Sequence, residues 1–323
     1  MEHWSNYWNS TQALNSFAES NSAQGYTGEI KDFWDTIFSQ QKQGSTVVDI
    51  GCGNGALSCL AVEYSNINRL NFNVHAIDAA DIDPSQILDD NPQSNNLKQV
   101  NFYPRTPVEE LPFEESSVDL FISQFGFEYA DTQIALEKVS KALKPEGKVI
   151  LLSHHQDSAV SHSTQSGIEV LNDVLNSSPL FIQVDLLLDI ASQVQASGQY
   201  GNWPQNPYNQ SISTTIRWIL DKLQQEFNTQ QQEVWIQDIF KRVVSVLQLV
   251  GKENPKQLRT FLAEQFKLLN EHCLRLKDQT KATFNDKKIE LLKSQAEQFT
   301  LKAKAQTFMI QGKPFAWFIE MIK

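Results

Sequence analysis

The stretch Val47-Val48-Asp49-Ile50-Gly51-Cys52-Gly53-Asn54-Gly55-Ala56-Leu57 decides how this chain folds. Two β-branched residues lead into an acid, glycines follow at alternate positions, and an apolar run begins after the last glycine. This order predicts a buried strand over 46–50, a tight turn and the first turn of a helix. Glycine tolerates a positive φ and lets a ligand approach the backbone closely. The unpaired N–H groups at the start of the helix attract an anion.

Three nucleotide-binding patterns compete for this glycine turn. A P-loop is excluded because no Gly-Lys-[Ser/Thr] follows. The relaxed dinucleotide pattern is met because Ala56 stands where the third glycine would be. The pattern D-x-G-x-G-x-G, which starts at Asp49, resembles motif I of the class I methyltransferases that use S-adenosylmethionine (SAM). The turn alone leaves these two readings open, beside a turn that binds no ligand.

Length and composition indicate a soluble globular protein. The chain has 323 residues, of which 41% are hydrophobic and 20% charged, enough for one large domain or two modest ones. No apolar run approaches the roughly 18 residues of a membrane span, and no secretory signal is visible at the N-terminus. We therefore expect a cytoplasmic protein without a membrane span.

No metal site or disulfide is expected. The three cysteines, Cys52, Cys59 and Cys273, lack the spacing of metal ligands, which indicates reduced and buried thiols. The histidines at 154, 155 and 162 also have no matching Cys or acid spacing.

The net charge of −11 is distributed unevenly. Residues 1–157 hold 9 Lys and Arg against 22 Asp and Glu, whereas residues 158–323 hold 18 against 16. An acidic first half argues against extended contact with nucleic-acid phosphates. The basic residues of the second half alternate with acids along helices, which is typical of a solvated face. No nucleic-acid partner is expected.

A second acid follows the next strand. The apolar segment 72–77 ends in Asp78, a little over 20 residues beyond the glycines. This spacing suits an acid at the end of strand two that accepts hydrogen bonds from both ribose hydroxyls, in dinucleotides and SAM alike. Asp81 and Asp83 are nearby alternatives.

A more specific resemblance lies further along. Glu109-Glu110-Leu111-Pro112-Phe113, followed by Val118-Asp119-Leu120-Phe121-Ile122-Ser123, is similar to the motif II–IV region of the type 11, quinone-biosynthesis-like SAM methyltransferases. Where that family has an acid facing adenine, this chain has Pro107, so adenine contact would fall to the backbone around Val108. Lys144-Pro145-Glu146-Gly147 predicts a turn, and residues 148–153 then predict a buried strand. Leu-Lys-Pro-Glu-Gly-Lys-Val-Ile-Leu, over residues 143–151, looks like the entry to strand five of the same family.

The order of elements predicts the fold class. Strands alternate with helices over residues 30–153, which indicates an α/β, doubly wound, mostly parallel sheet. Segments 299–308 and 315–322 flank a turn at 311–314 and predict an antiparallel hairpin. A seven-stranded Rossmann-like sheet with such a C-terminal hairpin is characteristic of class I methyltransferases, so the hairpin favours SAM over NAD.

The expected domains are a SAM-binding domain of residues 1–157 and 283–323 and a helical insertion of residues 158–282. Amphipathic stripes run over 180–191, 216–227, 235–250 and 258–276. We expect the insertion to form a cap over the substrate pocket. A homodimer surface and a stabilising decoration are the alternatives.

The resemblance and the strand ends together give the candidate site. The aromatic N-terminal segment, residues 1–27, either packs on the core or, as the resemblance implies, closes over the cofactor as a lid. The expected cofactor contacts are Asp49, Gly51, Cys52, Gly53, Gly55, Asp78, Ala79, Pro107, Val108, Gln124, Phe125, Tyr7 and Trp8. The candidate general bases or substrate contacts are His154, His155, Glu128 and Tyr129, which follow strands four and five.

The sequence thus indicates a SAM-dependent methyltransferase that acts on a small-molecule acceptor. Methylation of a protein, or less readily of RNA, keeps the same fold. A non-catalytic SAM-binding interaction module would also retain Asp49, the glycines and Asp78. NAD-dependent oxidoreduction is the weakest alternative.

Overall fold

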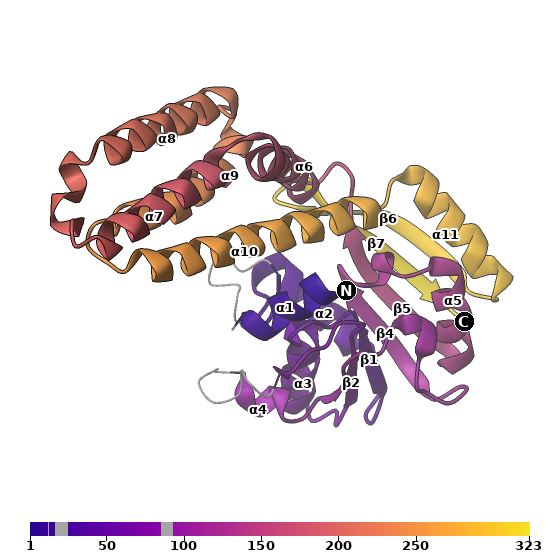
Figure 1. The fold of residues 1–323 in the computed structure, drawn as a ribbon. Helices are drawn as coiled ribbons and strands as arrows, with labels where there is room; N and C mark the ends of the chain where they lie inside the picture. Colours follow the sequence, from indigo (N-terminus) through magenta and orange to yellow (C-terminus); the bar gives the residue numbers. More distant parts are fainter. Residues whose placement is uncertain (12, 17–24, 85–92) are drawn as a thin grey trace. The chain divides into compact units, whose positions relative to one another are not determined.

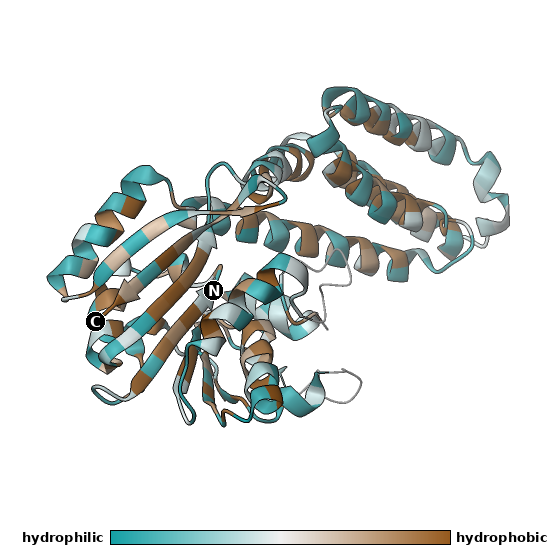
Figure 2. Cartoon of the chain, turned by 180° about the vertical axis from the view of Figure 1, so that it is seen from behind, coloured by the Kyte–Doolittle hydropathy of each residue, from teal (hydrophilic) through white to brown (hydrophobic). Residues whose placement is uncertain are grey.

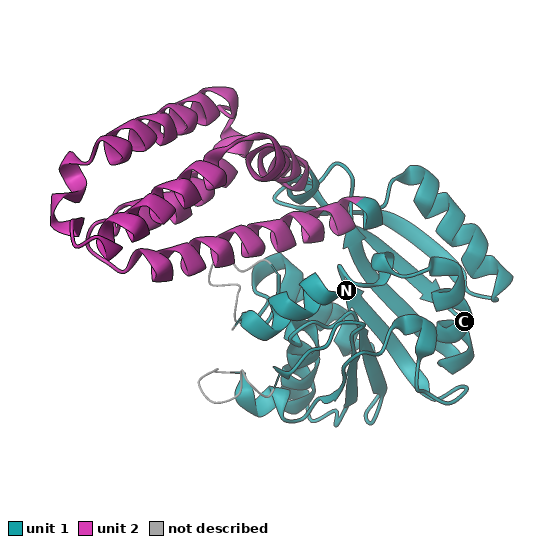
Figure 3. Cartoon of the chain, viewed as in Figure 1, with its two compact units in different colours: residues 1–161, 281–323 teal, residues 162–280 magenta. Residues whose placement is uncertain are grey.

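The structure is a computed structural model that describes residues 1–11, 13–16, 25–84 and 93–323. The chain divides into two compact units (Figure 3). Unit 1 comprises Met1–Ser161 and Lys281–Lys323, and unit 2 comprises His162–Thr280. Unit 2 is therefore an insertion between two segments of unit 1.

Unit 1 is built on a seven-stranded sheet (Figure 1). Its strands are β1 (Thr46–Ile50), β2 (Asn73–Ile77), β3 (Asn101–Tyr103), β4 (Val118–Gln124), β5 (Leu143–His154), β6 (Lys302–Ile310) and β7 (Lys313–Ile322). Their order is β3-β2-β1-β4-β5-β7-β6, and β7 runs antiparallel to both of its neighbours. The predicted mostly parallel sheet with a terminal hairpin is confirmed. The chain moves outward from β1 in both directions, so the β1–β4 edge is the switch point at which such sheets bind ligands.

Helices cover both faces of the sheet. The helical segments of unit 1 are α1 (Glu2–Ser10), α2 (Gly28–Ser39), α3 (Ala56–Asn68), α4 (Ser94–Leu97), η3 (Val108–Glu110), η4 (Phe127–Tyr129), α5 (Thr132–Ala142) and α11 (Asp286–Gln298). On one face, Trp34 and Phe38 of α2 pack with Leu60 of α3. On the other, Leu136 of α5 packs with Leu292 of α11. Figure 2 shows the central strands as mostly hydrophobic, as expected for a sheet buried on both faces.

Strand β5 begins earlier than the sequence predicts. The Lys-Pro-Glu-Gly segment was expected to form a turn before a strand over 148–153, but Leu143 already pairs with Val118. The register then shifts before Lys148 pairs with Leu120. Because proline has no N–H for the ladder and Glu146 has a φ of 64°, the segment forms an irregularity within the strand.

Unit 2 is helical and has its own core. Its elements are α6 (Ala159–Asn172), η5 (Asp173–Ser177), α7 (Leu180–Ala196), η6 (Tyr200–Gln205), α8 (Pro207–Glu226), α9 (Gln230–Leu247) and α10 (Pro255–Ala282). Helix α6 was not predicted, because its Ser-, Thr- and Gly-containing sequence gives little helical signal. Gly167 explains part of this composition. A Cβ there would lie 2.6 Å from Cε2 of Trp235, so glycine permits close packing of α6.

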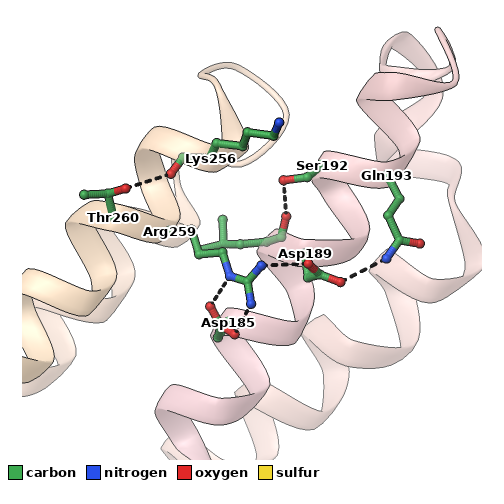
Figure 4. Close-up of polar contacts among 8 residues, drawn as sticks. Asp185, Asp189, Ser192, Gln193, Lys256, Arg259 and Thr260 are labelled. Atoms are coloured by element: carbon green, nitrogen blue, oxygen red, sulfur yellow. Dashed lines mark hydrogen bonds and ion pairs between the residues drawn. The ribbon is translucent and has the colours of Figure 1, made fainter.

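An arginine clamp joins α7 and α10 within unit 2 (Figure 4). Arg259 donates from Nε and Nη2 to the two carboxylate oxygens of Asp185, at 2.5 and 2.8 Å, and from Nη1 to Asp189 at 2.7 Å. The bidentate geometry favours this pair over ordinary surface ion pairs, although solvent exposure limits its contribution to about 1 kcal/mol.

In the described part of the chain, no helix alone has the length and apolar composition of a membrane span. One bent pair of helices, Ala159–Ser177 with Leu180–Ala196, meets that test jointly.

Candidate active site

The glycine turn links the ends of β1 and β2. Gly51, Gly53 and Gly55 have φ values of 68°, 52° and 90°, which lie in the left-handed region that favours glycine. The N–H groups of Gly51 and Cys52 both donate to the carbonyl oxygen of Ile77, at 2.9 and 3.1 Å. The turn therefore sits at the carboxyl ends of two adjacent parallel strands, as the sequence predicts.

The first glycine also permits a close backbone approach. A Cβ at Gly51 would lie 2.6 Å from Cα of Gly126 in the loop after β4. Side chains on either residue would force this backbone contact apart. The loops after β1 and β4 therefore meet at the switch point. Gly55 instead faces the core, where a Cβ would lie 2.8 Å from the Phe102 ring.

Asp78 is buried against the glycine turn. Its Oδ2 accepts from the Gly53 N–H at 2.8 Å, and its Oδ1 accepts from the Ala80 N–H at 2.7 Å. Burial raises the pKa of Asp78, and the two backbone hydrogen bonds oppose this rise. Each carboxylate oxygen has a further lone pair, so the acid can still accept from a ligand hydroxyl. Asp81, by contrast, pairs with Arg105 at 2.6 Å on the surface, and Ala79 lies between the two acids.

Asp49 is the second buried acid. Its Oδ2 accepts a 2.6 Å hydrogen bond from the Ser58 hydroxyl, while its Oδ1 has no hydrogen-bond partner among the described residues. Burial raises the pKa of Asp49 to about 7, and the negative charge of Asp78 adds to the rise. A cation close to Oδ1 would lower the pKa of Asp49 and so favour the ionised carboxylate.

The segment after β3 also reaches this edge. Thr106 donates its N–H to the carbonyl oxygen of Asp78 at 2.7 Å. Pro107 follows in an extended conformation, and Val108 is buried at the start of η3. This places the segment expected at adenine next to the loop that carries Asp78. Contact of Pro107 and Val108 with adenine stays a prediction.

Polar and aromatic side chains gather at the ends of β4 and β5. Glu128 Oε1 accepts from the backbone N–H of His154 at 2.7 Å. The His154 ring stacks on Phe125, with ring centroids 4.3 Å apart, and meets the edge of Tyr129 at 6.2 Å. Phe125 has a φ of 60°, a conformation that an aromatic residue rarely adopts. The structure thus brings three of the four candidate catalytic residues together.

Burial changes the charge state of two of these residues. It raises the pKa of Glu128 to about 7, against the opposing hydrogen bond from the His154 backbone. It lowers the pKa of His154 to about 3. Near neutral pH the imidazole is therefore uncharged, and Glu128 is poised between its acid and its carboxylate.

The fourth candidate, His155, has a different environment. Its Nδ1 accepts from the Asp157 N–H at 3.0 Å, and its Nε2 lies 3.3 Å from the Thr307 hydroxyl. Its ring stacks on Trp317 at 4.6 Å. With both nitrogens engaged, His155 is suited to holding the end of β5 rather than to transferring protons. Its catalytic role stays a prediction that this geometry does not favour.

Helix α1 lies over the glycine turn. A Cβ at Gly53 would lie 2.5 Å from Cζ2 of Trp8, and Tyr7 packs edge-on against Trp8 at 5.0 Å. Asn54 donates from Nδ2 to the carbonyl oxygens of Trp8 and Ala13. Residues 12 and 17–24 of the expected lid lie outside the described residues. Direct contact of Tyr7 and Trp8 with the cofactor stays a prediction.

Sequence reasoning missed Trp34, Asn54 and Ser58. Trp34 Nε1 donates to Oε1 of Gln124 at 2.7 Å, and both side chains are buried. Asn54 and Ser58 stand within or just after the glycine turn, so the motif itself could have suggested them. Trp34 is part of an amphipathic stripe on α2, and nothing in the local sequence distinguishes it from the other core residues of that stripe.

Unpartnered polar atoms test whether this edge fits SAM. Six buried side-chain atoms here have no hydrogen-bond partner of good geometry within the described ranges: Asp49 Oδ1, Asn54 Oδ1, Gln124 Nε2, Glu128 Oε2, Ser153 Oγ and His154 Nδ1. Ser153 still lies close enough to Glu128 to oppose the rise of its pKa. Buried polar groups are rarely unpaired unless a ligand or water completes them. SAM offers an ammonium, a carboxylate, ribose hydroxyls and a sulfonium, which match this mixture of acceptors and donors. Across residues 1–11, 13–16, 25–84 and 93–323, no cluster of His, Cys, Asp or Glu could hold a metal ion.

The fold and the buried acids at this edge are those expected of the class I methyltransferases that bind SAM. The comparison with family models identifies the chain further, since residues 41–208 match a family described as a methyltransferase domain. The chain belongs to this methyltransferase family. No curated protein matches the chain in a sequence comparison.

Solved structures with similar folds share low identity with the chain. A geranyl diphosphate methyltransferase in complex with GPP and sinefungin is 17% identical, over 42% of this chain and 51% of that one, with a TM-score of 0.34. The geranyl diphosphate C-methyltransferase of Streptomyces coelicolor A3(2) is 16% identical, over 47% and 64%, with a TM-score of 0.32. A putative methyltransferase of Haloferax volcanii, in complex with the activator Trm112, is 24% identical, over 42% and 60%, with a TM-score of 0.30. The chain thus covers between half and two thirds of these structures.

Proposed function

We propose that the enzyme methylates a small, flat and largely apolar molecule that carries one acidic O–H or N–H hydrogen. The relationship to the type 11 group is part of this proposal. The observation that carries it is the pairing of an aromatic wall with the unpartnered carboxylate oxygen of Glu128 at the ends of β4 and β5.

The aromatic wall is partly buried and comes from four parts of unit 1, namely α1, the segment after β4, β5 and β7. Phe125 stacks on His154 and meets the edge of Phe315 at 5.5 Å. Tyr129 meets the edge of Trp4 at 5.7 Å. Aromatic faces favour offset or edge contact with another flat ring, so they suit a planar acceptor. The acidic charge of this half of the chain disfavours polyanionic acceptors such as RNA.

Each of these residues has a separate role in methyl transfer. SAM supplies an electrophilic methyl group on a positively charged sulfur. In this proposal Asp78 holds the ribose and Asp49 holds the ammonium. Glu128 accepts the proton of the acceptor through Oε2, because its Oε1 already accepts the His154 N–H. His154 stays neutral and supports the aromatic wall. Orientation and exclusion of water then supply much of the rate.

A panel of acceptors tests the proposal. We expect release of S-adenosylhomocysteine (SAH) with flat phenols or related heterocycles, and none with peptides or RNA. Phe125→Leu should raise the acceptor KM by about fivefold, as removal of one ring contact costs about 1 kcal/mol. Phe113→Leu, which alters a ring packed against His75 and Tyr103, is the matched control. Turnover with peptides alone would overturn the proposal.

We also propose that the insertion influences acceptor choice. Both of its connections lie at the end of β5, where Phe284 donates its N–H to the carbonyl oxygen of His154 at 2.9 Å. It stays a prediction that the insertion acts as a cap and that the protein forms a homodimer through the insertion. A cytoplasmic location also stays a prediction.

Replacement of residues 162–280 by a short Gly-Ser linker is the test of this role. Since each unit has its own core, SAH should bind within about threefold of the intact chain, while the acceptor KM rises by about tenfold or more. An unchanged KM would show that the insertion does not select the acceptor.

A further inference from the structure

One buried hydrogen bond fixes a side chain at the switch point. Trp34 Nε1 donates to Gln124 Oε1 at 2.7 Å. Trp34 is 0% exposed and Gln124 is 8% exposed, so water cannot substitute for this bond without rearrangement of the core. The two residues are 90 positions apart in sequence, and the bond ties the middle of α2 to the last residue of β4.

The chemistry of the pair determines which way the amide points. An indole nitrogen can only donate a hydrogen bond. Gln124 must therefore present its oxygen to Trp34, and its Nε2 must point elsewhere. Within the described part of the chain, this buried Nε2 meets no acceptor. A buried amide donor that is left unpaired destabilises the structure, so a ligand that supplies an acceptor here gains affinity.

The donor belongs to the glycine-turn side of the sheet. Trp34 packs in one cluster with Cys52 of the turn and Leu57 of α3. Two residues beyond Gln124, the backbone of Gly126 meets Gly51. The amide thus lies at the end of β4, bonded to α2 and two residues before the glycine that meets the turn.

Its chemistry also differs from that of the other unpartnered atoms. Asp49 and Asn54 offer acceptors, and Glu128, Ser153 and His154 can change between donor and acceptor with protonation, rotation or tautomer. Of the six, Gln124 Nε2 alone is confined to donating. SAM has one anionic group, its carboxylate, and a charged acceptor strengthens a hydrogen bond.

We propose that Trp34 is a positioning residue that orients the Gln124 amide so that its Nε2 donates to the carboxylate of SAM. The inference rests on SAM binding at this edge and adds a specific partner for one end of the molecule. Trp34 acts through Gln124 and does not touch the ligand.

The test compares two ligands that differ only in the carboxylate. SAH and decarboxylated SAH are titrated calorimetrically into the full chain and into Gln124→Met, Gln124→Glu and Trp34→Phe. Gln124→Met should weaken SAH by about tenfold, the typical worth of one hydrogen bond to a charged group, and leave decarboxylated SAH within about twofold. Gln124→Glu should weaken SAH further, because a carboxylate would then face a carboxylate. Trp34→Phe should show the same selectivity, with no added loss when combined with Gln124→Met.

Several outcomes would overturn the inference. Equal losses for both ligands would assign Gln124 a structural role, and no loss for either would remove it from the site. Additive losses in the double variant would show that Trp34 does not act through Gln124. If Trp34→Phe fails to fold, the two Gln124 variants still decide whether the amide meets the carboxylate. Failure of the unmodified chain to bind either ligand would instead refute SAM binding itself.

Discussion

Glu128→Gln is expected to lower kcat by about 100-fold, at the lower end of the loss that follows removal of a general base. The amide keeps the shape of the side chain and can still accept from the His154 N–H. It cannot take up the acceptor's proton. The acceptor KM should change little, because the aromatic wall remains. Steady-state kinetics over pH 5–9 measure both quantities.

The pH dependence of the rate gives a more specific test of the role of Glu128. Burial raises the pKa of Glu128 to about 7, and the carboxylate is the active form. The wild-type rate should therefore rise through pH 7 and level off above it, and the Gln variant should lack this rise. Glu110→Gln, which removes an exposed acid, is the control. A Glu128→Gln enzyme with a normal rate and a normal profile would exclude the proposed proton transfer.

The thermal stability of the wild type should fall with rising pH, whereas its rate should rise. Because the pKa of Glu128 is higher in the folded chain than its ordinary value, the folded state binds this proton more tightly than the unfolded state. The stability from the neutral form is present in acid and is lost as pH rises toward and through about 7. Glu128→Gln removes that loss, so its melting temperature relative to wild type should be higher at pH 8 than at pH 5. A constant difference between the two pH values would contradict the buried charge.

Asp78→Asn is expected to weaken SAH binding by about 100-fold, because a charged acceptor facing two ribose hydroxyls contributes about 1.5–3 kcal/mol per hydrogen bond. The 2′-deoxy analogue of SAH should bind more weakly than SAH to the wild type, and this difference should shrink in the variant. Isothermal titration calorimetry with both ligands measures the coupling.

The control for Asp78 is the nearby alternative acid. Asp81 pairs with Arg105 on the surface, so Asp81→Asn should keep SAH affinity within about twofold. A melting curve of each variant separates weak binding from unfolding, since Asp78 also holds the Gly53 and Ala80 N–H groups. If Asp78→Asn is folded and binds SAH normally, Asp78 does not hold the ribose.

Much of the fold follows from local sequence patterns. The glycine turn, the acid at Asp78 and the terminal hairpin each depend on nearby residues, so their positions could be predicted. Helix α6 could not, because Gly167 serves a contact with Trp235, 68 positions away in sequence. Where the sequence suggested a turn before β5, pairing of Leu143 with Val118 extended the strand.

The candidate site was likewise predictable only in part. Residues at strand ends were predictable because parallel strands end at one edge. His154 and His155 are adjacent in sequence, yet one stacks in the aromatic wall and the other on Trp317. Side chains alternate between the two faces of a strand, and only packing shows which face holds the site. The Trp34–Gln124 pair depends on the same long-range packing.

A crystal structure of the chain with SAH tests the proposed cofactor site most directly. We expect SAH at the carboxyl edge of β1, β2 and β4, with both ribose hydroxyls within hydrogen-bond distance of the Asp78 carboxylate. SAH bound elsewhere, or with its ribose away from Asp78, would contradict this expectation.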